Sequence, residues 1–275
     1  MTNTTIAFVG AGNMARSLIG GLLEESSQYR IAAADPDAAQ RARLAAAFQI
    51  PVSDQNRAAT DGADIVVLAV KPQIVRTVCV DLREQLAAQR PLLVSIAAGV
   101  RTTDISRWLA YDTAIVRCMP NTPALVRSGA TALYANARVS GAQRDSAESL
   151  MRAVGTIVWV DEEDALDAVT ALSGSGPAYF FAVMEAMEEA AVSMGLSRDQ
   201  ARLLTLETAL GAAKMALEAG EAPAQLRANV TSEGGTTQAA LQVFAQRALA
   251  DTLTQAMVAA RNRAREIGTQ LGADE

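Results

Sequence analysis

The sequence predicts an α/β protein in which an N-terminal doubly wound parallel sheet is followed by a C-terminal all-helical domain. Two observations predict this class. Short apolar, β-branched runs alternate with amphipathic helical segments as far as residue 161, and almost all of the chain from there to residue 275 has helical periodicity. We therefore expect two domains, one at 1–161 and the other at 162–275.

The elements of the predicted sheet follow one another in the first 160 residues. Strand candidates are 6–9, 29–34, 65–70, 92–97 and 114–119, and segments such as 14–25, 37–48 and 72–86 have helical spacing between them. Continuous apolar strands separated by helices are typical of a parallel sheet covered on both faces. Two later strands, at 130–134 and 156–160, flank a helix at 143–154 and are expected to complete the sheet edge.

The composition is that of an ordinary globular chain, with 50% apolar and 20% charged residues among 275. Histidine is absent, and the two cysteines, Cys79 and Cys118, are isolated. This excludes zinc sites built from these residue types and mechanisms that need an imidazole, so we expect no metal. Two thiols without a disulfide framework are typical of a reducing compartment, which predicts a cytoplasmic location.

Charge and hydropathy limit the partners. The formal net charge of −6 argues against a nucleic-acid partner. No basic segment followed by an apolar one opens the chain, and the longest uncharged stretch, 168–184, is interrupted at 173–177 by glycines and a proline. We therefore expect no membrane segment and a small-molecule substrate.

The helical half contains a segment that is apolar on nearly every side. Residues 202–219 carry only four charged side chains, and such a helix must be buried on most faces. A domain of about 115 residues is too small to bury several helices of this kind, which predicts a dimerisation domain and a homodimer. The alternative is that this helix forms the centre of an ordinary bundle.

A glycine-rich turn lies between the first strand and the first helix. Its sequence, Gly10-Ala11-Gly12-Asn13-Met14-Ala15, is a G-x-G-x-x-A pattern. In a Rossmann domain the first glycine allows the tight turn, the second lets the backbone approach a pyrophosphate, and the small last residue permits close packing of helix on strand. The N–H groups at the start of the helix would then face the phosphates. The motif therefore predicts a dinucleotide cofactor.

Asp35 ends the second predicted strand, and its surroundings do not decide between NADH and NADPH. An acidic residue there accepts a hydrogen bond from the ribose 2′-OH, which favours NADH. Arg41 and Arg43 follow within two helical turns and could face the 2′-phosphate of NADPH if Asp35 turns away. The alternative is that Asp35 and Pro36 form only a turn and a helix cap.

Three more segments end strands at the same edge of the predicted sheet: 69–72, 97–99 and 119–123. Lys71 could reach a ribose or a phosphate there, and Pro72 starts the next helix. The small residues at 97–99 would let a nicotinamide ring lie against the backbone. Each segment alone also fits ordinary loop chemistry, but together they predict a binding crevice.

Two helix breaks interrupt the second half, at 173–177 and 229–237. The second break is rich in hydroxyl groups and precedes a helix, so its N–H groups and the helix dipole could cradle a carboxylate. The alternative is a capped connection between two helices.

Six ordered blocks of the chain, at 8–14, 69–72, 94–100, 117–123, 167–179 and 234–237, match a known family. On these blocks the chain resembles pyrroline-5-carboxylate reductases over essentially its whole length. The resemblance implies reduction of 1-pyrroline-5-carboxylate to L-proline with NADPH or NADH, the last step of proline biosynthesis. It also implies a homodimer, often assembled into a larger ring, whose active site draws on both subunits.

The resemblance implies a set of site residues as well. The cofactor set is Gly10, Ala11, Gly12, Asn13, Met14, Asp35, Asn56, Ala69, Val70, Lys71, Pro72, Ala97, Ala98 and Asn121. The substrate set is Glu163, Asn229, Gly235, Thr236 and Thr237, with Thr237 as the catalytic group whose hydroxyl is hydrogen-bonded to the ring nitrogen. Glu233 stands where many members have proline, and we expect it to point into solvent, because its charge would repel the substrate carboxylate.

The absence of histidine is consistent with imine reduction, since a C=N substrate can already carry its proton. Two alternatives remain. One is a hydroxyacid dehydrogenase of similar two-domain plan that uses Lys214, and the other is a nucleotide-binding regulator without catalysis. An isolated cation on a helix is more often a surface residue than a catalyst.

Overall fold

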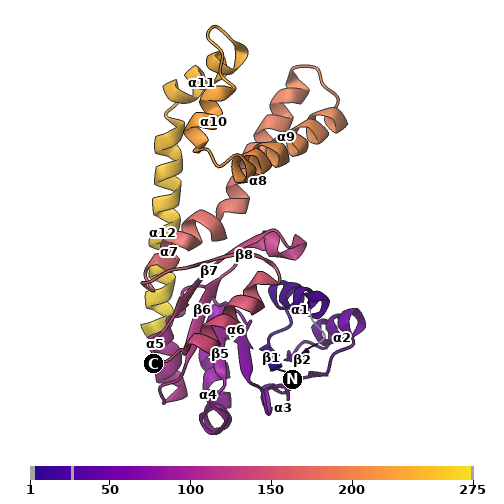
Figure 1. Ribbon diagram of the computed structural model, residues 1–275, viewed down its shortest axis with the longest axis vertical. Coiled ribbons are helices and arrows are strands. Elements are labelled where there is room, and N and C mark those ends of the chain that lie inside the picture. Colours follow the sequence, from indigo (N-terminus) through magenta and orange to yellow (C-terminus); the bar gives the residue numbers. More distant parts are fainter. Residues whose placement is uncertain (1–3, 26–27, 274–275) are drawn as a thin grey trace. The chain divides into compact units, whose positions relative to one another are not determined.

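The computed structural model describes residues 4–25 and 28–273, and Figure 1 labels most of their helices and strands. Their strands form an eight-stranded sheet in the order β3-β2-β1-β4-β5-β6-β7-β8. The strands are β1 (Thr4–Val9), β2 (Tyr29–Ala34), β3 (Val52–Ser53), β4 (Ile65–Leu68), β5 (Leu92–Ser95), β6 (Ile115–Met119), β7 (Gly129–Ala135) and β8 (Gly155–Trp159). All neighbours are parallel except β6 and β7. The predicted doubly wound sheet is therefore confirmed, with one antiparallel pair.

The described helices of the first half connect these strands, and those of the second half follow one another without strands. They are α1 (Asn13–Glu25), α2 (Ala38–Phe48), α3 (Asn56–Thr60), α4 (Pro72–Gln89), α5 (Thr102–Leu109), η1 (Thr122–Val126), α6 (Gly141–Arg152), α7 (Ala165–Val169), η2 (Thr170–Gly174), α8 (Gly176–Ser193), α9 (Arg198–Glu218), α10 (Pro223–Asn229), α11 (Thr236–Gln246) and α12 (Leu249–Ala273). The all-helical second half agrees with the prediction.

The core of the sheet is divided between its two faces, because successive side chains of a strand point to opposite sides. In β1, Ile6 and Phe8 join a buried cluster with residues of α1, α2 and α6. Ala7 and Val9 join a second cluster with residues of α4 and α5. Both faces of the central strands are thus covered, which fixes the strand ends as the open edge.

The chain forms two compact units. One comprises the chain up to Ser175 together with residues from Ala259 onward, and the other is Gly176–Val258. These units do not coincide with the boundary between 161 and 162, which marks where helical periodicity begins. Residues 162–175 are helical in sequence but pack with the sheet, as does the end of α12. The division into 1–161 and 162–275 stays a prediction about domains.

The helical unit contains a hairpin of α8 and α9, which pack against each other. Ser197 caps α9 in a reciprocal arrangement with Gln200: its Oγ accepts from the Gln200 N–H, and the Gln200 side chain accepts from the Ser197 N–H. Many large apolar side chains of this unit are exposed, including Phe180, Leu203 and Leu210 at 67%, 60% and 63%.

Within residues 4–25 and 28–273, no helix combines the length and apolar character needed to cross a membrane.

Candidate active site

The glycine-rich turn has the conformation that its motif predicts. Gly10 has a φ of +103°, and a Cβ atom on it would lie 2.4 Å from the carbonyl oxygen of Ala69. A Cβ atom on Gly12 would have no heavy atom within 4 Å, so the backbone there borders open space. The Arg16 N–H already bonds the Gly12 carbonyl oxygen at 3.0 Å, so helix α1 begins at the turn. Its first N–H groups lack partners within the helix, and this arrangement fits the pyrophosphate of a dinucleotide.

Asp35 holds this turn from the end of β2. Its Oδ2 accepts from the Ala11 N–H at 2.8 Å, and its Oδ1 accepts from the Asp37 N–H at 2.9 Å. Arg41 donates to the carbonyl oxygens of Asp35 and Pro36 at 2.7 and 3.0 Å. Asp35 thus forms a turn, but the N-cap of α2 is Asp37, which accepts from the Ala39 N–H.

The predicted cofactor residues follow the carboxyl ends of parallel strands. The 10–14 turn follows β1, Asp35 follows β2, Asn56 follows β3, 69–72 follows β4, Ala97 and Ala98 follow β5, and Asn121 follows β6. Parallel strands present these ends at one edge of the sheet. The chain order reverses between β1 and β4, which is the place where open α/β sheets bind ligands.

Two amides of this set are engaged within the protein. Asn121 is buried, donates to the carbonyl oxygen and hydroxyl of Ser173 at 3.2 and 3.3 Å, and accepts from the Ala130 N–H at 3.0 Å. Asn56 donates to Asp81 on α4 at 3.4 Å. Lys71 is exposed and precedes α4, with Pro72 at its first turn as predicted. The side chain of Asn121 therefore joins the end of β6 to Ser173 and to β7.

The predicted substrate residues of the helical unit lie at two neighbouring helix ends. Asn229 ends α10, accepts from Gln225 and donates to Glu221, both at 2.8 Å. Gly235 is the N-cap of α11, which starts with Thr236 and Thr237. Gly234 has a φ of +70°, so the glycine allows the bend before this helix. Glu233 is exposed, as predicted.

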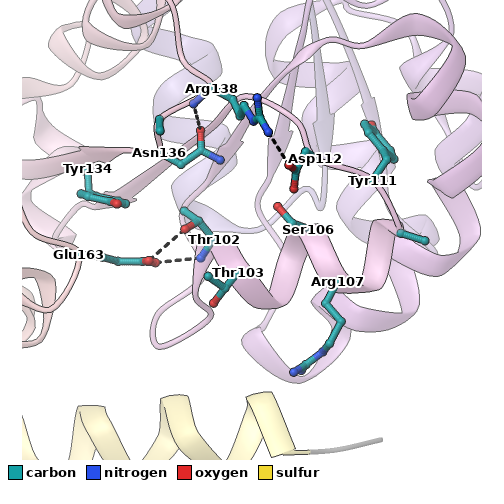
Figure 2. A pocket seen from close by; sticks show the side chains of 12 residues that line it. Thr102, Thr103, Ser106, Arg107, Tyr111, Asp112, Tyr134, Asn136, Arg138 and Glu163 are labelled. Atoms are coloured by element: carbon teal, nitrogen blue, oxygen red, sulfur yellow. Dashed lines mark hydrogen bonds and ion pairs between the residues drawn. The ribbon is translucent and has the colours of Figure 1, made fainter.

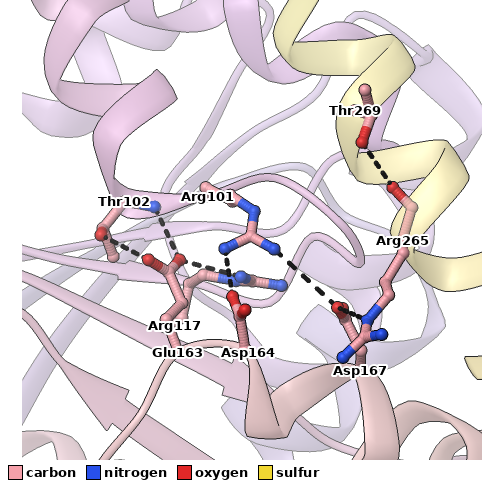
Figure 3. A network of polar contacts seen from close by, with 8 residues as sticks. All are labelled: Arg101, Thr102, Arg117, Glu163, Asp164, Asp167, Arg265 and Thr269. Carbon is pink, nitrogen blue, oxygen red and sulfur yellow. Dashed lines mark hydrogen bonds and ion pairs between the residues drawn. The ribbon is translucent and has the colours of Figure 1, made fainter.

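Glu163 belongs to the sheet unit and is held by three hydrogen bonds (Figure 3). Its Oε1 accepts from the Thr102 N–H and from Arg117, each at 2.8 Å, and its Oε2 accepts from the Thr102 hydroxyl at 2.9 Å. Arg117 lies in β6 with 5% of its surface exposed. Thr102 is the first residue of α5, whose N–H has no helical partner, so Glu163 closes that helix end.

Sequence reasoning missed Arg117 and Thr102 as partners of Glu163. A signal was present, because Arg117 interrupts the apolar run of β6, and a charge inside a buried strand requires a partner.

A second set of ion pairs adjoins this carboxylate. Arg101 pairs with Asp164 at 2.5 Å and lies 3.9 Å from Asp167, which also pairs with Arg265 of α12 at 3.5 Å. The hydrogen bond from Arg101 lowers the pKa of the Asp164 carboxyl below its ordinary value. These pairs join the loop after β5 to α7 and the residue before it, and α7 to the C-terminal half of α12.

A pocket of about 660 Å³ opens beside α5 (Figure 2). Glu163, Thr102 and Tyr134 lie at one part of its lining, and Arg138 pairs with Asp112 at 2.6 Å at another. Among the described residues that line this pocket, Glu163 is the only predicted site residue. Burial, with smaller contributions from the charges of Glu163 and Glu162, raises the pKa of Tyr134.

The comparisons with known proteins agree over the whole chain. Residues 163–267 match the family described as pyrroline-5-carboxylate reductase dimerisation, and residues 5–99 match NADP oxidoreductase coenzyme F420-dependent. A pyrroline-5-carboxylate reductase of Pseudomonas aeruginosa is 51% identical across 99% of this chain and 100% of its own. The chain belongs to the pyrroline-5-carboxylate reductase family. An Arabidopsis thaliana member is 36% identical, with 95% of each chain covered.

Solved structures of the family have the same fold. A pyrroline-5-carboxylate reductase from Coxiella burnetii superposes with a TM-score of 0.91 at 44% identity, covering 96% of this chain and 98% of that one. The Plasmodium falciparum enzyme, solved with NADP bound, gives 0.85 at 27% identity and covers 98% and 99%.

For the alternative, a hydroxyacid dehydrogenase, the comparisons show only a similarity of fold. A 3-hydroxyisobutyrate dehydrogenase from Mycobacterium tuberculosis is 19% identical with a TM-score of 0.50, covering 98% of this chain and 94% of that one. Lys214, the residue that this alternative requires, lies on α9 with 69% of its side chain exposed and 3.9 Å from Glu218. This is the arrangement of an ordinary surface ion pair.

Proposed function

We propose that this chain reduces 1-pyrroline-5-carboxylate to L-proline with NADPH or NADH, as the last step of proline biosynthesis. The observation that carries this function is the 51% identity to a pyrroline-5-carboxylate reductase across the full length of that relative. The reduced nicotinamide, when bound, supplies a hydride to the C=N carbon of the substrate. The ring nitrogen keeps its proton and becomes the amine of proline.

The edge of the sheet is proposed to hold the cofactor. The open space beside Gly12 and the free N–H groups of α1 support binding of the pyrophosphate there. Asp35 and Arg41 would border the adenosine ribose, Lys71 would reach a ribose or a phosphate, and Asn56, Val70, Ala98 and Asn121 would complete the cofactor site.

The helical unit is proposed to supply most of the substrate site. The N–H groups of Thr236 and Thr237 in the first turn of α11 and the dipole of this helix favour a carboxylate at this helix end. Thr237 would hold the ring nitrogen through its hydroxyl, and Asn229 and Glu163 would complete the polar lining. A neutral hydroxyl suffices because a protonated C=N group needs no strong acid.

This chain has the dimerisation domain of its family, which supports an oligomer. We propose a homodimer that assembles into a larger ring, with an active site shared between subunits. The exposed apolar side chains of α8 and α9 support burial against a second copy. We also propose a cytoplasmic location, supported by two buried free thiols, Cys79 and Cys118.

The test mixes purified protein, reduced cofactor and 1-pyrroline-5-carboxylate, follows the loss of nicotinamide absorbance, and identifies L-proline by chromatography. Absence of turnover with both cofactors, from folded protein, would contradict the function. Oxidation of the cofactor by a hydroxyacid's keto form but not by the imine would favour the alternative enzyme class. Cofactor binding without turnover of any imine or ketone would indicate a regulator.

A further inference from the structure

Arg117 and Thr102 hold the carboxylate of Glu163, which has one position left to accept a hydrogen bond. A carboxylate offers about four lone-pair positions. Thr102 N–H and Arg117 occupy those of Glu163 Oε1, and the Thr102 hydroxyl occupies one of Oε2. The Glu163 side chain is 11% exposed and lines the pocket beside α5, so the remaining position of Oε2 is within reach of a ligand.

Stability alone is a weak reason for this arrangement. Burying an Arg–Glu pair costs desolvation of both charges, and apolar residues of similar volume are often as stabilising. Ile115, two residues before Arg117 and on the same face of β6, is fully buried, so this face of the strand also packs with an uncharged residue. What the ion pair adds is a fixed carboxylate, since donors from two elements, β6 and α5, leave it little rotational freedom.

We propose that Arg117 and Thr102 are positioning residues of the reductase, which orient Glu163 so that the negative charge of its Oε2 faces the protonated ring nitrogen of the substrate. This inference rests on the proposed function. Thr102 lies four residues beyond Ala98 and thereby links this carboxylate to the strand end proposed for the cofactor.

The experiment measures KM for 1-pyrroline-5-carboxylate and for NADPH in Arg117→Met, Arg117→Lys and Thr102→Val. Arg117→Met is expected to raise the substrate KM about tenfold and to change the NADPH KM by less than about twofold. Arg117→Lys keeps the charge and should recover part of the affinity. Thr102→Val loses one hydrogen bond and should raise the substrate KM about threefold.

The matched control is Arg152→Met, because Arg152 forms an ion pair with Glu148 on α6 but neither lines this pocket nor contacts Glu163. It should leave both KM values unchanged. In a Glu163→Gln background, Arg117→Met should add little to the rise in substrate KM, since both changes act through one carboxylate.

Two results would overturn the inference: an unchanged substrate KM in Thr102→Val and in folded Arg117→Met, or effects of Arg117→Met and Glu163→Gln that multiply. If Arg117→Met does not fold, Thr102→Val and Arg117→Lys decide in its place. Wild-type protein without reductase activity would contradict the proposed function instead, before any variant is compared.

Discussion

Asp35 and Ala11 are joined across the carboxyl ends of two strands, because the Asp35 Oδ2 accepts from the Ala11 N–H at 2.8 Å. The side chain that would meet the adenosine ribose therefore also shapes the turn that would meet the pyrophosphate. Charge and turn geometry at this position can be separated by the choice of substitution.

Asp35→Asn removes the charge and keeps an acceptor oxygen for the Ala11 N–H, whereas Asp35→Ser also shortens the side chain. Both should raise the ratio of kcat/KM with NADPH to kcat/KM with NADH, because an anion facing the 2′-phosphate is lost. The expected change is on the order of 1 kcal/mol, or about fivefold. Steady-state kinetics with both cofactors checks it. An unchanged ratio in Asp35→Asn would mean that the carboxylate only holds the turn.

Thr237→Ala should lower kcat by about ten- to a hundredfold, or ~1.4–2.7 kcal/mol, because the group that orients the ring nitrogen is lost. Thr237→Ser should keep most of the rate, since the hydroxyl remains. Lys214→Met serves as the control and should change kcat little, because Lys214 is exposed. Circular dichroism confirms folding. A collapse of kcat in Lys214→Met, with Thr237→Ala nearly intact, would instead support the hydroxyacid dehydrogenase.

The exposed apolar residues of the helical unit predict that no folded monomer persists at micromolar concentration. Leu210→Glu on α9 should weaken the oligomer, because the side chain is 63% exposed in the single chain and would be buried by a partner. Val158→Glu on β8, at a site 56% exposed in the sheet unit, is the matched control. Sedimentation velocity distinguishes them. A stable, active wild-type monomer would refute the shared active site.

Burial raises the pKa of the Cys79 thiol to about 12. A thiol in the unfolded chain titrates near 8.5, so its contribution to stability is complete below about pH 8.5 and is lost as the pH rises toward 12. Urea unfolding at about pH 8 and 10.5 measures this loss in the wild type and in Cys79→Ala, which lacks the titrating group. The variant should lose less stability between the two pH values. Equal losses would show that Cys79 does not contribute.

The sequence predicted the strands that carry the cofactor edge because each is a continuous apolar run bounded by turn residues. It missed β3, since Val52 and Ser53 form too short a segment to show any period. It also did not predict that β7 runs antiparallel to β6, because an apolar run carries no information on direction. Strand direction depends on the path of the connection through η1, which is a tertiary property.

The site was predictable where a motif has a local conformational cause. Gly10 is such a case, because its positive φ and its closeness to Ala69 both exclude a side chain. Arg117 and Thr102 were not identified, although they hold Glu163, because their partner lies 46 and 61 residues away in the chain. Helical periodicity likewise marked residues 162–175 as helical but could not indicate that they pack with the sheet.

The sheet unit is discontinuous along the chain, because residues from Ala259 onward rejoin it after the helical unit. In particular, a Cβ atom on Gly268 would lie 2.8 Å from the Gly99 carbonyl oxygen, so α12 packs directly on the loop after β5. On the ribosome, that loop is synthesised long before the segment that covers it. The nucleotide-binding half of this protein can therefore complete its packing only after the helical unit has been translated.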